Sequence, residues 1–249
     1  MKDKIYTIPV TDAYQTDCAC PLCFLQDVLE KNALDYYLGP SLMEPDVRAS
    51  TNESGFCKDH LQQMYDREIN RLGLGLMLHT HVKDILDDIG NDMRGSAPAQ
   101  GTFFKGRDKD YKKNLEALAE RIDGRAASCM ICKKIESTME RYMDVLFWMY
   151  FEQDGFQKLF ESKTRYCLPH MADVLRGCAK YLSQNQAAVF LEKFADLQLG
   201  GMKKLEDELE WFTLKFDYRN QDKPWGESKD AVPHGISLLG GGSSFLTSV

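Results

Sequence analysis

The stretch Cys20-Pro21-Leu22-Cys23, answered downstream by Cys57-Lys58-Asp59-His60, sets the organisation of this chain. Both motifs then occur a second time, as Cys129-Met130-Ile131-Cys132 and Cys167-Leu168-Pro169-His170. The gap between the two motifs is 34 positions in the first set and 35 in the second. Corresponding motifs lie 109 and 110 positions apart. This matched spacing predicts an internal repeat that carries the same kind of site twice.

The residue types in these motifs indicate metal binding. Cysteine thiolates and a neutral imidazole are the ligands that zinc prefers, four at a time in a closed tetrahedron. Each motif also lies at the start of an expected helix, where free N–H groups favour thiolate over thiol. We predict two sites of three cysteines and one histidine, with zinc as the metal and iron as the alternative. The predicted ligands are Cys20, Cys23, Cys57, His60, Cys129, Cys132, Cys167 and His170.

The pairing of the motifs is open at this point. Local pairing would join Cys20 and Cys23 to Cys57 and His60, and crossed pairing would join them to Cys167 and His170. A helix of about 15 residues carries the chain about 22 Å away. About 17 loop residues suffice to bring it back. Local pairing is therefore the simpler expectation.

Catalytic signatures are absent from the sequence. A closed set of four ligands is structural by default, because catalytic zinc keeps one position for water. The H-x-E and P-C-x-x-C motifs of zinc deaminases do not occur, nor do HExxH, a Gly-rich phosphate loop or a nucleophile elbow. A redox role for Cys20 and Cys23 of the thioredoxin type would need a βαβ context. The sequence therefore favours a protein that is not an enzyme.

Other chemistry-bearing residues receive simpler interpretations. Cys18 could replace Cys20 as a ligand, but the repeat favours Cys20. Cys178 is expected to be a buried small apolar residue. His79 and His81 lie two positions apart on an expected helix, so they face different ways and predict no further metal site. Near the end of the chain, four residues could line a small pocket, although a segment held across the helices by its tryptophan is favoured: Arg219, Asn220, Trp225 and Asp230.

The composition limits which cellular compartment and which kinds of partner we expect for this protein. The 249 residues are 43% hydrophobic and 28% charged, which suits one sizeable core or two small ones. The net charge of −7 makes nucleic acid and anionic membranes unfavourable as partners. The densest basic run, 105–113, is expected to be a solvated linker. We see no signal peptide and no apolar run of about 18 residues. A cytosolic protein is expected, in which eight cysteines indicate metal rather than disulfides.

Apolar spacings of three and four predict an all-α fold. Residues 1–17 are expected to be extended, and 40–56 to form a loop. The expected organisation is a first metal-binding repeat at 1–90, a linker at 91–110, a second repeat at 111–217 and an irregular tail at 218–249. Helices are expected at 20–38, 58–72 and 76–89 (with Gly73 and Gly75 between them), 112–122, 129–152, 156–162, 168–178 and 184–216.

The paired motifs CPLC…GFCKDH and CMIC…YCLPH resemble those of an uncharacterised family of bacterial cytosolic proteins, known only as a domain of unknown function. The segment KFDYRNQDKPWGESKDA is similar to the C-terminal segment of that family. The resemblance covers Cys20 to about Gly235. It implies a bacterial origin and two Cys/Cys/Cys/His sites, and it implies no activity.

These observations lead to three functional hypotheses. The first is a zinc-stabilised interaction or adaptor protein whose partner is another protein, with neither nucleic acid nor membrane as a partner. The alternative is a metal or thiol-based redox sensor, suggested by the additional thiols of Cys18 and Cys178. A third and weaker hypothesis is an enzyme that uses a pocket near the C-terminal segment. Sequence alone leaves the oligomeric state open.

Overall fold

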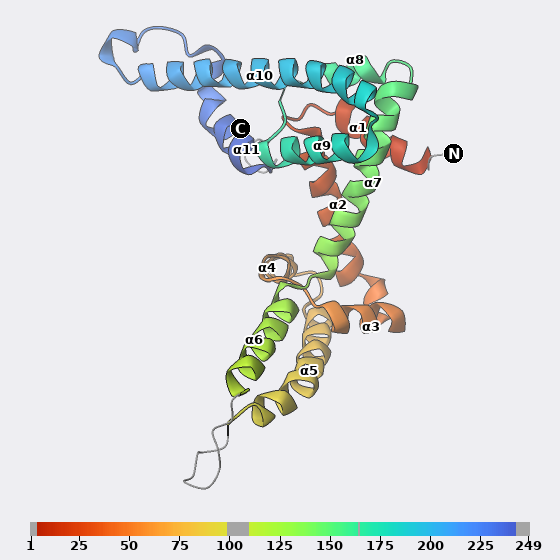
Figure 1. Ribbon diagram of the computed structural model, residues 1–249. Helices are drawn as coiled ribbons and strands as arrows, with labels where there is room; N and C mark the ends of the chain where they lie inside the picture. The colour runs from red at the N-terminus through yellow and green to blue at the C-terminus, as the bar shows by residue number, and fades with distance from the viewer. Residues whose placement is uncertain (1–3, 99–109, 164, 243–249) are drawn as a thin grey trace. The chain divides into compact units, whose positions relative to one another are not determined.

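A computed structural model describes residues 4–98, 110–163 and 165–242 (Figure 1). Within these residues the chain is helical and contains no β-strand, which confirms the all-α prediction. The described residues form two compact units. The described residues of 1–29 and 136–249 make up the first unit, and those of 30–135 make up the second. These units differ from the consecutive halves expected from the sequence, because the first unit combines both ends of the chain.

Two helices contain the boundaries between the units. Helix α2 (Pro21–Leu38) begins in the first unit and ends in the second, and α7 (Met130–Glu152) begins in the second and ends in the first. Both helices were expected from their apolar spacing, and their observed bounds agree with the expected 20–38 and 129–152. The chain therefore passes between the units within regular helix.

The first unit is built around an aromatic core. Its other elements are η1 (Lys4–Tyr6), α1 (Thr7–Gln15), α8 (Phe156–Glu161), α9 (Leu168–Tyr181), α10 (Gln184–Leu214), η3 (Tyr218–Asn220), η4 (Gly226–Asp230) and α11 (Ala231–Gly240). Phe160 and Phe190 are fully buried and pack at a ring-centroid distance of 5.4 Å. Tyr150 lies against both rings, at 5.2 and 5.0 Å. The burial of these apolar side chains is the main contribution to the stability of the first unit.

The second unit contains η2 (Pro40–Met43), α3 (Pro45–Ser54), α4 (Lys58–Asp66), α5 (Arg71–Gly95) and α6 (Tyr111–Ala127). Arg125 of α6 donates a hydrogen bond to the carbonyl of Glu53 at 2.7 Å and pairs with Asp84 of α5 at 2.8 Å. Arg121 pairs with Asp92 at 2.6 Å. Helices α5 and α6 are thus joined mainly by ion pairs along their length.

Several expectations about irregular segments were wrong. Residues 7–15 form α1, residues 45–54 form α3 and residues 231–240 form α11. The break after α4 falls at 67–70, and α5 runs through both Gly73 and Gly75. Asn70 fixes that start, because its side chain accepts a hydrogen bond from the Gly73 N–H at 2.9 Å.

Part of the expected linker and tail lies outside the described residues. The linker was expected at 91–110, but α5 continues to Gly95. Residues 99–109, which hold most of the basic run, and residues 243–249 fall outside the description.

Candidate metal centres

The eight predicted ligands come together in two groups of four. The first centre consists of Cys20, Cys23, Cys167 and His170, and the second centre consists of Cys57, His60, Cys129 and Cys132. In each group the four ligand atoms lie within 4.8 Å of one another. Each centre takes its CxxC pair from one motif set and its CxxH pair from the other. The pairing is therefore crossed, and the expectation of local pairing was wrong.

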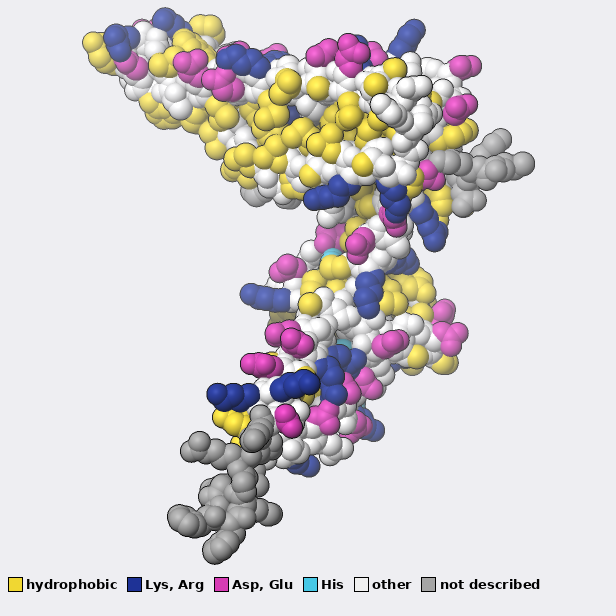
Figure 2. Space-filling model, viewed as in Figure 1, with side chains coloured by type: hydrophobic (Ala, Val, Ile, Leu, Met, Phe, Trp, Pro, Cys, Tyr) yellow, Lys and Arg dark blue, Asp and Glu magenta, His cyan; other side chains and the backbone are white. Residues whose placement is uncertain are grey.

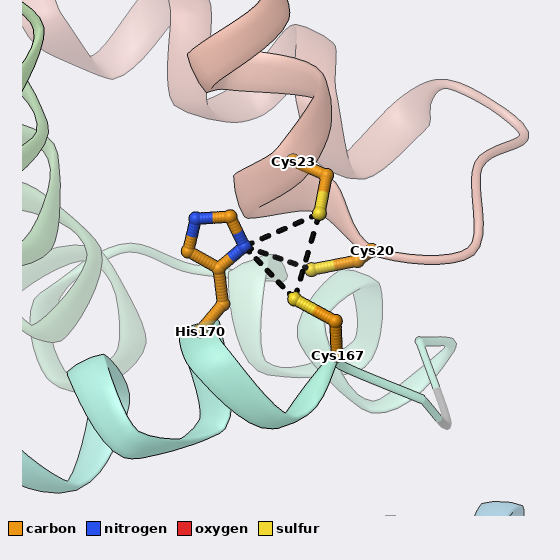
Figure 3. A group of neighbouring side chains, drawn as sticks. All are labelled: Cys20, Cys23, Cys167 and His170. Atoms are coloured by element: carbon orange, nitrogen blue, oxygen red, sulfur yellow. Dashed lines mark hydrogen bonds between the residues drawn. The ribbon is translucent and has the colours of Figure 1, made fainter. Parts of the chain in front are cut away.

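In the first centre the four side chains point toward one another around a common point (Figure 3). His170 Nδ1 lies 3.1 Å from Cys167 Sγ, 3.2 Å from Cys23 Sγ and 3.6 Å from Cys20 Sγ. The Sγ atoms of Cys23 and Cys167 are 3.5 Å apart. A zinc tetrahedron has edges of about 3.8 Å between sulfurs and about 3.6 Å between sulfur and nitrogen. The first centre comes close to these dimensions.

Two helix N-termini supply the first centre. Cys20 directly precedes α2, and Cys167 is the N-cap of α9 with an extended backbone. Pro21 and Pro169 occupy the first turns, where proline suits the fixed φ and the missing N–H has no helical partner. The positive ends of both helix dipoles face the thiolates. This arrangement partly offsets the negative charge of three thiolates.

The second centre has the same construction. His60 Nδ1 lies 3.1 Å from Cys57 Sγ, 3.3 Å from Cys129 Sγ and 3.4 Å from Cys132 Sγ. Cys57 is the N-cap of α4, and Cys129 directly precedes α7. The backbone N–H of Met130 donates to the carbonyl of Gly55 at 3.0 Å. This bond holds the start of α7 beside the chain that leads into Cys57.

A close approach at Gly55 positions that chain. Gly55 has φ +61°, and a Cβ there would lie 2.5 Å from Nε2 of His81. His81 Nδ1 in turn lies 2.8 Å from the Asn52 carbonyl, which accepts its hydrogen bond. His81 is not among the residues of either centre. Its position at the turn before Cys57 was not expected.

Each histidine ligand is held by a side chain of α2. His170 Nε2 donates to Gln26 Oε1 at 3.0 Å, and His60 Nε2 donates to Glu30 Oε1 at 3.0 Å. The Glu30 oxygen also accepts from Gln63 Nε2 at 3.0 Å. A partner on one ring nitrogen fixes the tautomer that presents the other nitrogen to a metal. Both histidines therefore offer Nδ1 as the ligand atom.

The C-terminal segment closes over the first centre. Gly241 ends α11 with φ +76°, and the Gly242 N–H donates to Cys23 Sγ at 3.3 Å. A Cβ on Gly241 would lie 3.4 Å from Cys167 Sγ. Both glycines fall in the segment expected to be an irregular tail, and their position beside the sulfurs was not expected. No signal in a Gly/Ser-rich run distinguishes a glycine that contacts a site from one that does not.

The two centres differ in exposure and in charge. All four ligands of the first centre are buried, whereas Cys132 of the second is exposed and Cys57 is half-buried. The pKa of His60 is raised to about 9, chiefly by its hydrogen bond to Cys129. Hydrogen bonds from Cys167 and Cys23 lower the pKa of the Cys20 thiol. A metal ion must therefore displace protons on binding, from His60 in particular.

The remaining candidates lie outside both centres. Cys18 Sγ faces the carbonyl of Ala13 at 3.6 Å, and Cys178 is buried in the core as expected. Burial raises the pKa of both thiols. Trp225 packs against Phe212 at 5.7 Å. Of the other tail residues, Arg219 pairs with Asp217 in an exposed position, Asn220 caps the end of α10 through the Leu214 carbonyl, and Asp230 lines a cavity.

The fold and the two centres define a class, namely an all-α protein with two Cys3His clusters that can hold metal ions. Within that class, the chain belongs to the family of unknown function DUF6062, whose model matches residues 1–245. This match confirms the resemblance to an uncharacterised domain. No curated protein and no solved structure matches the chain. Among the described helices, none combines the length and the apolar character that crossing a membrane requires.

Proposed function

We propose that this protein binds two zinc ions at structural Cys3His centres and that the metal-stabilised fold serves as an interaction or adaptor protein. The observation that supports this proposal is that, in each centre, three Sγ atoms and one Nδ1 atom lie around a common point. Such a set fills a zinc tetrahedron and leaves no position for water or substrate. Soft thiolates with one imidazole also suit iron, which remains the alternative metal.

Each ion would join segments that are far apart in the chain. Cys23 and Cys167 are 144 positions apart, and Cys57 and Cys132 are 75 apart. Because such sites do not exist in the unfolded chain, the free energy of metal binding becomes folding free energy. The bound metals would thereby hold the starts of α2 and α9, and of α4 and α7, at fixed separations.

Elemental analysis of untagged protein purified without chelator tests the metal assignment. The expected result is two zinc ions per chain. Cys57→Ser and Cys132→Ser are each expected to lose one zinc and part of the helical circular dichroism signal. Iron in place of zinc, fewer than two ions per chain, or native-like circular dichroism in both variants would contradict the proposal.

Exposed apolar side chains on the first unit support the interaction role. Figure 2 shows apolar side chains gathered over the region of α9, α10 and α11. Two large apolar residues of these helices are exposed, namely Leu199 of α10 at 65% and Leu239 of α11 at 67%. Contiguous exposed apolar surface is typical of protein-binding sites. We propose a protein partner for this surface, with neither nucleic acid nor membrane as the target.

Affinity capture with a matched pair of variants tests this role. Leu199→Asp with Leu239→Asp is expected to lose a partner that the wild-type chain retains, while zinc content and circular dichroism stay unchanged. The control is Leu86→Asp, at a residue of the second unit with 65% exposure. Recovery of the same proteins by all three chains would argue against a docking surface at α9–α11.

A sensor remains the second candidate, and the exposure of Cys132 favours it. An accessible thiolate ligand is the point at which oxidant or chelator attacks a zinc site. In this alternative the second centre releases zinc under mild peroxide and forms a reversible disulfide, while the buried first centre keeps its metal. Retention of both ions under peroxide would exclude the sensor.

A further inference from the structure

A cavity of about 580 Å³ lies in the first unit. It is bordered by α10, η4, α11, the residues that lead into α2 and those that lead into α9. None of the eight metal-ligand residues belongs to its described lining. Its volume falls within the range of small-molecule sites. The cavity is therefore a candidate binding site distinct from the two metal centres.

The lining carries both signs of charge, with three cationic and four acidic side chains. Two of the cations already have partners. Lys204 pairs with Glu227, and Lys163 donates to the carbonyl of Thr16. A simple anion would meet the four acidic groups, and a simple cation would meet the three basic ones. The mixed lining favours a ligand that carries both charges.

Arg165 and Glu208 face this cavity without forming an ion pair. Among the described residues, no carboxylate lies within 4.0 Å of the half-buried Arg165 guanidinium. The Glu208 side chain is 13% exposed, and its ion-pair partner Lys204 is 3.7 Å away, beyond hydrogen-bond distance. Charges withdrawn from water are costly unless they are paired. A ligand placed between the two groups would pair with Arg165 and would give Glu208 a hydrogen bond in addition to its 3.7 Å ion pair with Lys204.

His234 contributes a third polar group. Its Nδ1 is buried and has no hydrogen-bond partner among the described residues. Burial, and then the charge of Arg165, lowers the pKa of this imidazole. The ring is therefore neutral at pH 7. His234 lines the cavity, so its ring lies within reach of a ligand bound there.

We propose that this cavity binds a free α-amino acid, with the ligand carboxylate on Arg165 and the ligand ammonium on Glu208. An α-amino acid carries its two charges on adjacent atoms, which matches a guanidinium and a carboxylate that face one cavity but do not meet. Arginine binds a carboxylate with two parallel hydrogen bonds. The His234 ring contacts the ligand beside these groups, and the remaining volume holds the ligand side chain.

The test is an NMR titration of the zinc-loaded full chain. The probes are each of the common L-amino acids, acetate and methylammonium, at equal millimolar concentrations. The readout is the ring resonance of His234, assigned with His234→Gln. At least one amino acid is expected to give a saturable shift that acetate and methylammonium do not reproduce. An equal response to acetate would indicate an anion site, and no saturable response would indicate a water-filled cavity; either result overturns the proposal.

Variants locate the binding groups. Arg165→Gln and Glu208→Gln are each expected to weaken amino-acid binding by at least about tenfold. Arg165→Lys keeps the charge but loses the two-pronged geometry, and an intermediate loss is expected. The matched controls are Arg176→Gln and Glu206→Gln, at exposed residues already paired with Asp173 and Lys203. Equal binding by the Arg165 and Glu208 variants and these controls, all with native circular dichroism, would place the amino acid elsewhere.

Discussion

At the scale of single residues, Gly241 has a backbone conformation that favours glycine and lies beside a ligand of the first centre. Its φ of +76° strains any other residue, and a Cβ would lie 3.4 Å from Cys167 Sγ. Gly241→Ala is therefore expected to cost about 1 kcal/mol of unfolding free energy and to speed zinc loss from the first centre. Urea unfolding measures the first effect. Zinc release to a coloured chelator, in a Cys57→Ser/Cys132→Ser background, measures the second.

Gly240 provides the control for this prediction. It lies within α11, and among the described residues no neighbouring atom lies within 4 Å of its added Cβ. Gly240→Ala should leave zinc release unchanged and should stabilise the helix slightly. If both alanine variants release zinc at the wild-type rate, the contact between the glycine segment and the first centre has no energetic consequence.

Glu30 provides a second test at this scale, because its carboxylate holds the Nε2 proton of His60. Loss of such a partner lowers metal affinity by about 10- to 100-fold. Glu30→Ala is expected to reduce zinc affinity of the second centre by that factor. Competition titration in a Cys23→Ser/Cys167→Ser background isolates this centre. Glu116→Ala, at an exposed residue of α6, is the control, and equal affinity in the two variants would remove Glu30 from the site.

Sequence reasoning found the eight ligands but none of the groups around them. Cysteine and histidine at fixed spacing carry a signal of their own, because few other roles need that pattern. Gln26 and Glu30 are ordinary polar residues on a helix, one turn apart. Their roles follow from the approach of His170 and His60, which come from distant parts of the chain. The residues next to Gln26 and Glu30 in the sequence give no indication of that approach.

At the scale of elements, the predictable helices are those with an apolar stripe. Helices α2 and α7 bury several large side chains each, so their spacing is visible in the sequence. Helix α3 buries only Thr51 and Ser54. Its sequence therefore has no apolar residues at helical spacing from which the helix could be predicted. Pro45 at its first turn and Gly55 at its end were present as signals. They were outweighed by the polar composition, which is also typical of loops.

Lys215 organises the turn that follows α10. It is 5% exposed, and its Nζ donates to the carbonyls of Asn220 and Gln221 at 2.8 Å and to that of Lys223. Lys215→Met would leave these carbonyls without their donor, at an expected cost of about 2 kcal/mol. Urea unfolding measures the loss. Lys203→Met, at a lysine with 67% side-chain exposure, is the control. Equal stability of both variants would show that the turn holds without the ammonium.

At the scale of the whole molecule, spacing alone could not decide how the motifs pair. The entropy of loop closure rises only with the logarithm of loop length. Closing the 144-position separation of Cys23 and Cys167 instead of a separation of about 34 costs only about 1 kcal/mol more. The packing of the aromatic core in the first unit outweighs a term of that size. The crossed pairing follows from this tertiary packing.

Double variants test the pairing directly. Cys57→Ser with Cys132→Ser removes two ligands of one crossed centre, so one zinc ion per chain is expected to remain. Cys23→Ser with Cys57→Ser damages both crossed centres, and no tightly bound zinc is expected. Local pairing reverses the two outcomes. Elemental analysis of the two proteins after dialysis against a weak chelator therefore distinguishes the arrangements.

The crossed pairing places one ligand set inside the other along the chain, with consequences during synthesis on the ribosome. Cys20 and Cys23 emerge first, yet their partners Cys167 and His170 emerge last. The second centre is complete once Cys132 has emerged, so it can load first. Until then Cys57 and His60 are the nearest available partners for the N-terminal pair. If both centres bind metal as proposed, early capture of Cys57 and His60 by Cys129 and Cys132 would remove that competing quartet before Cys167 and His170 emerge.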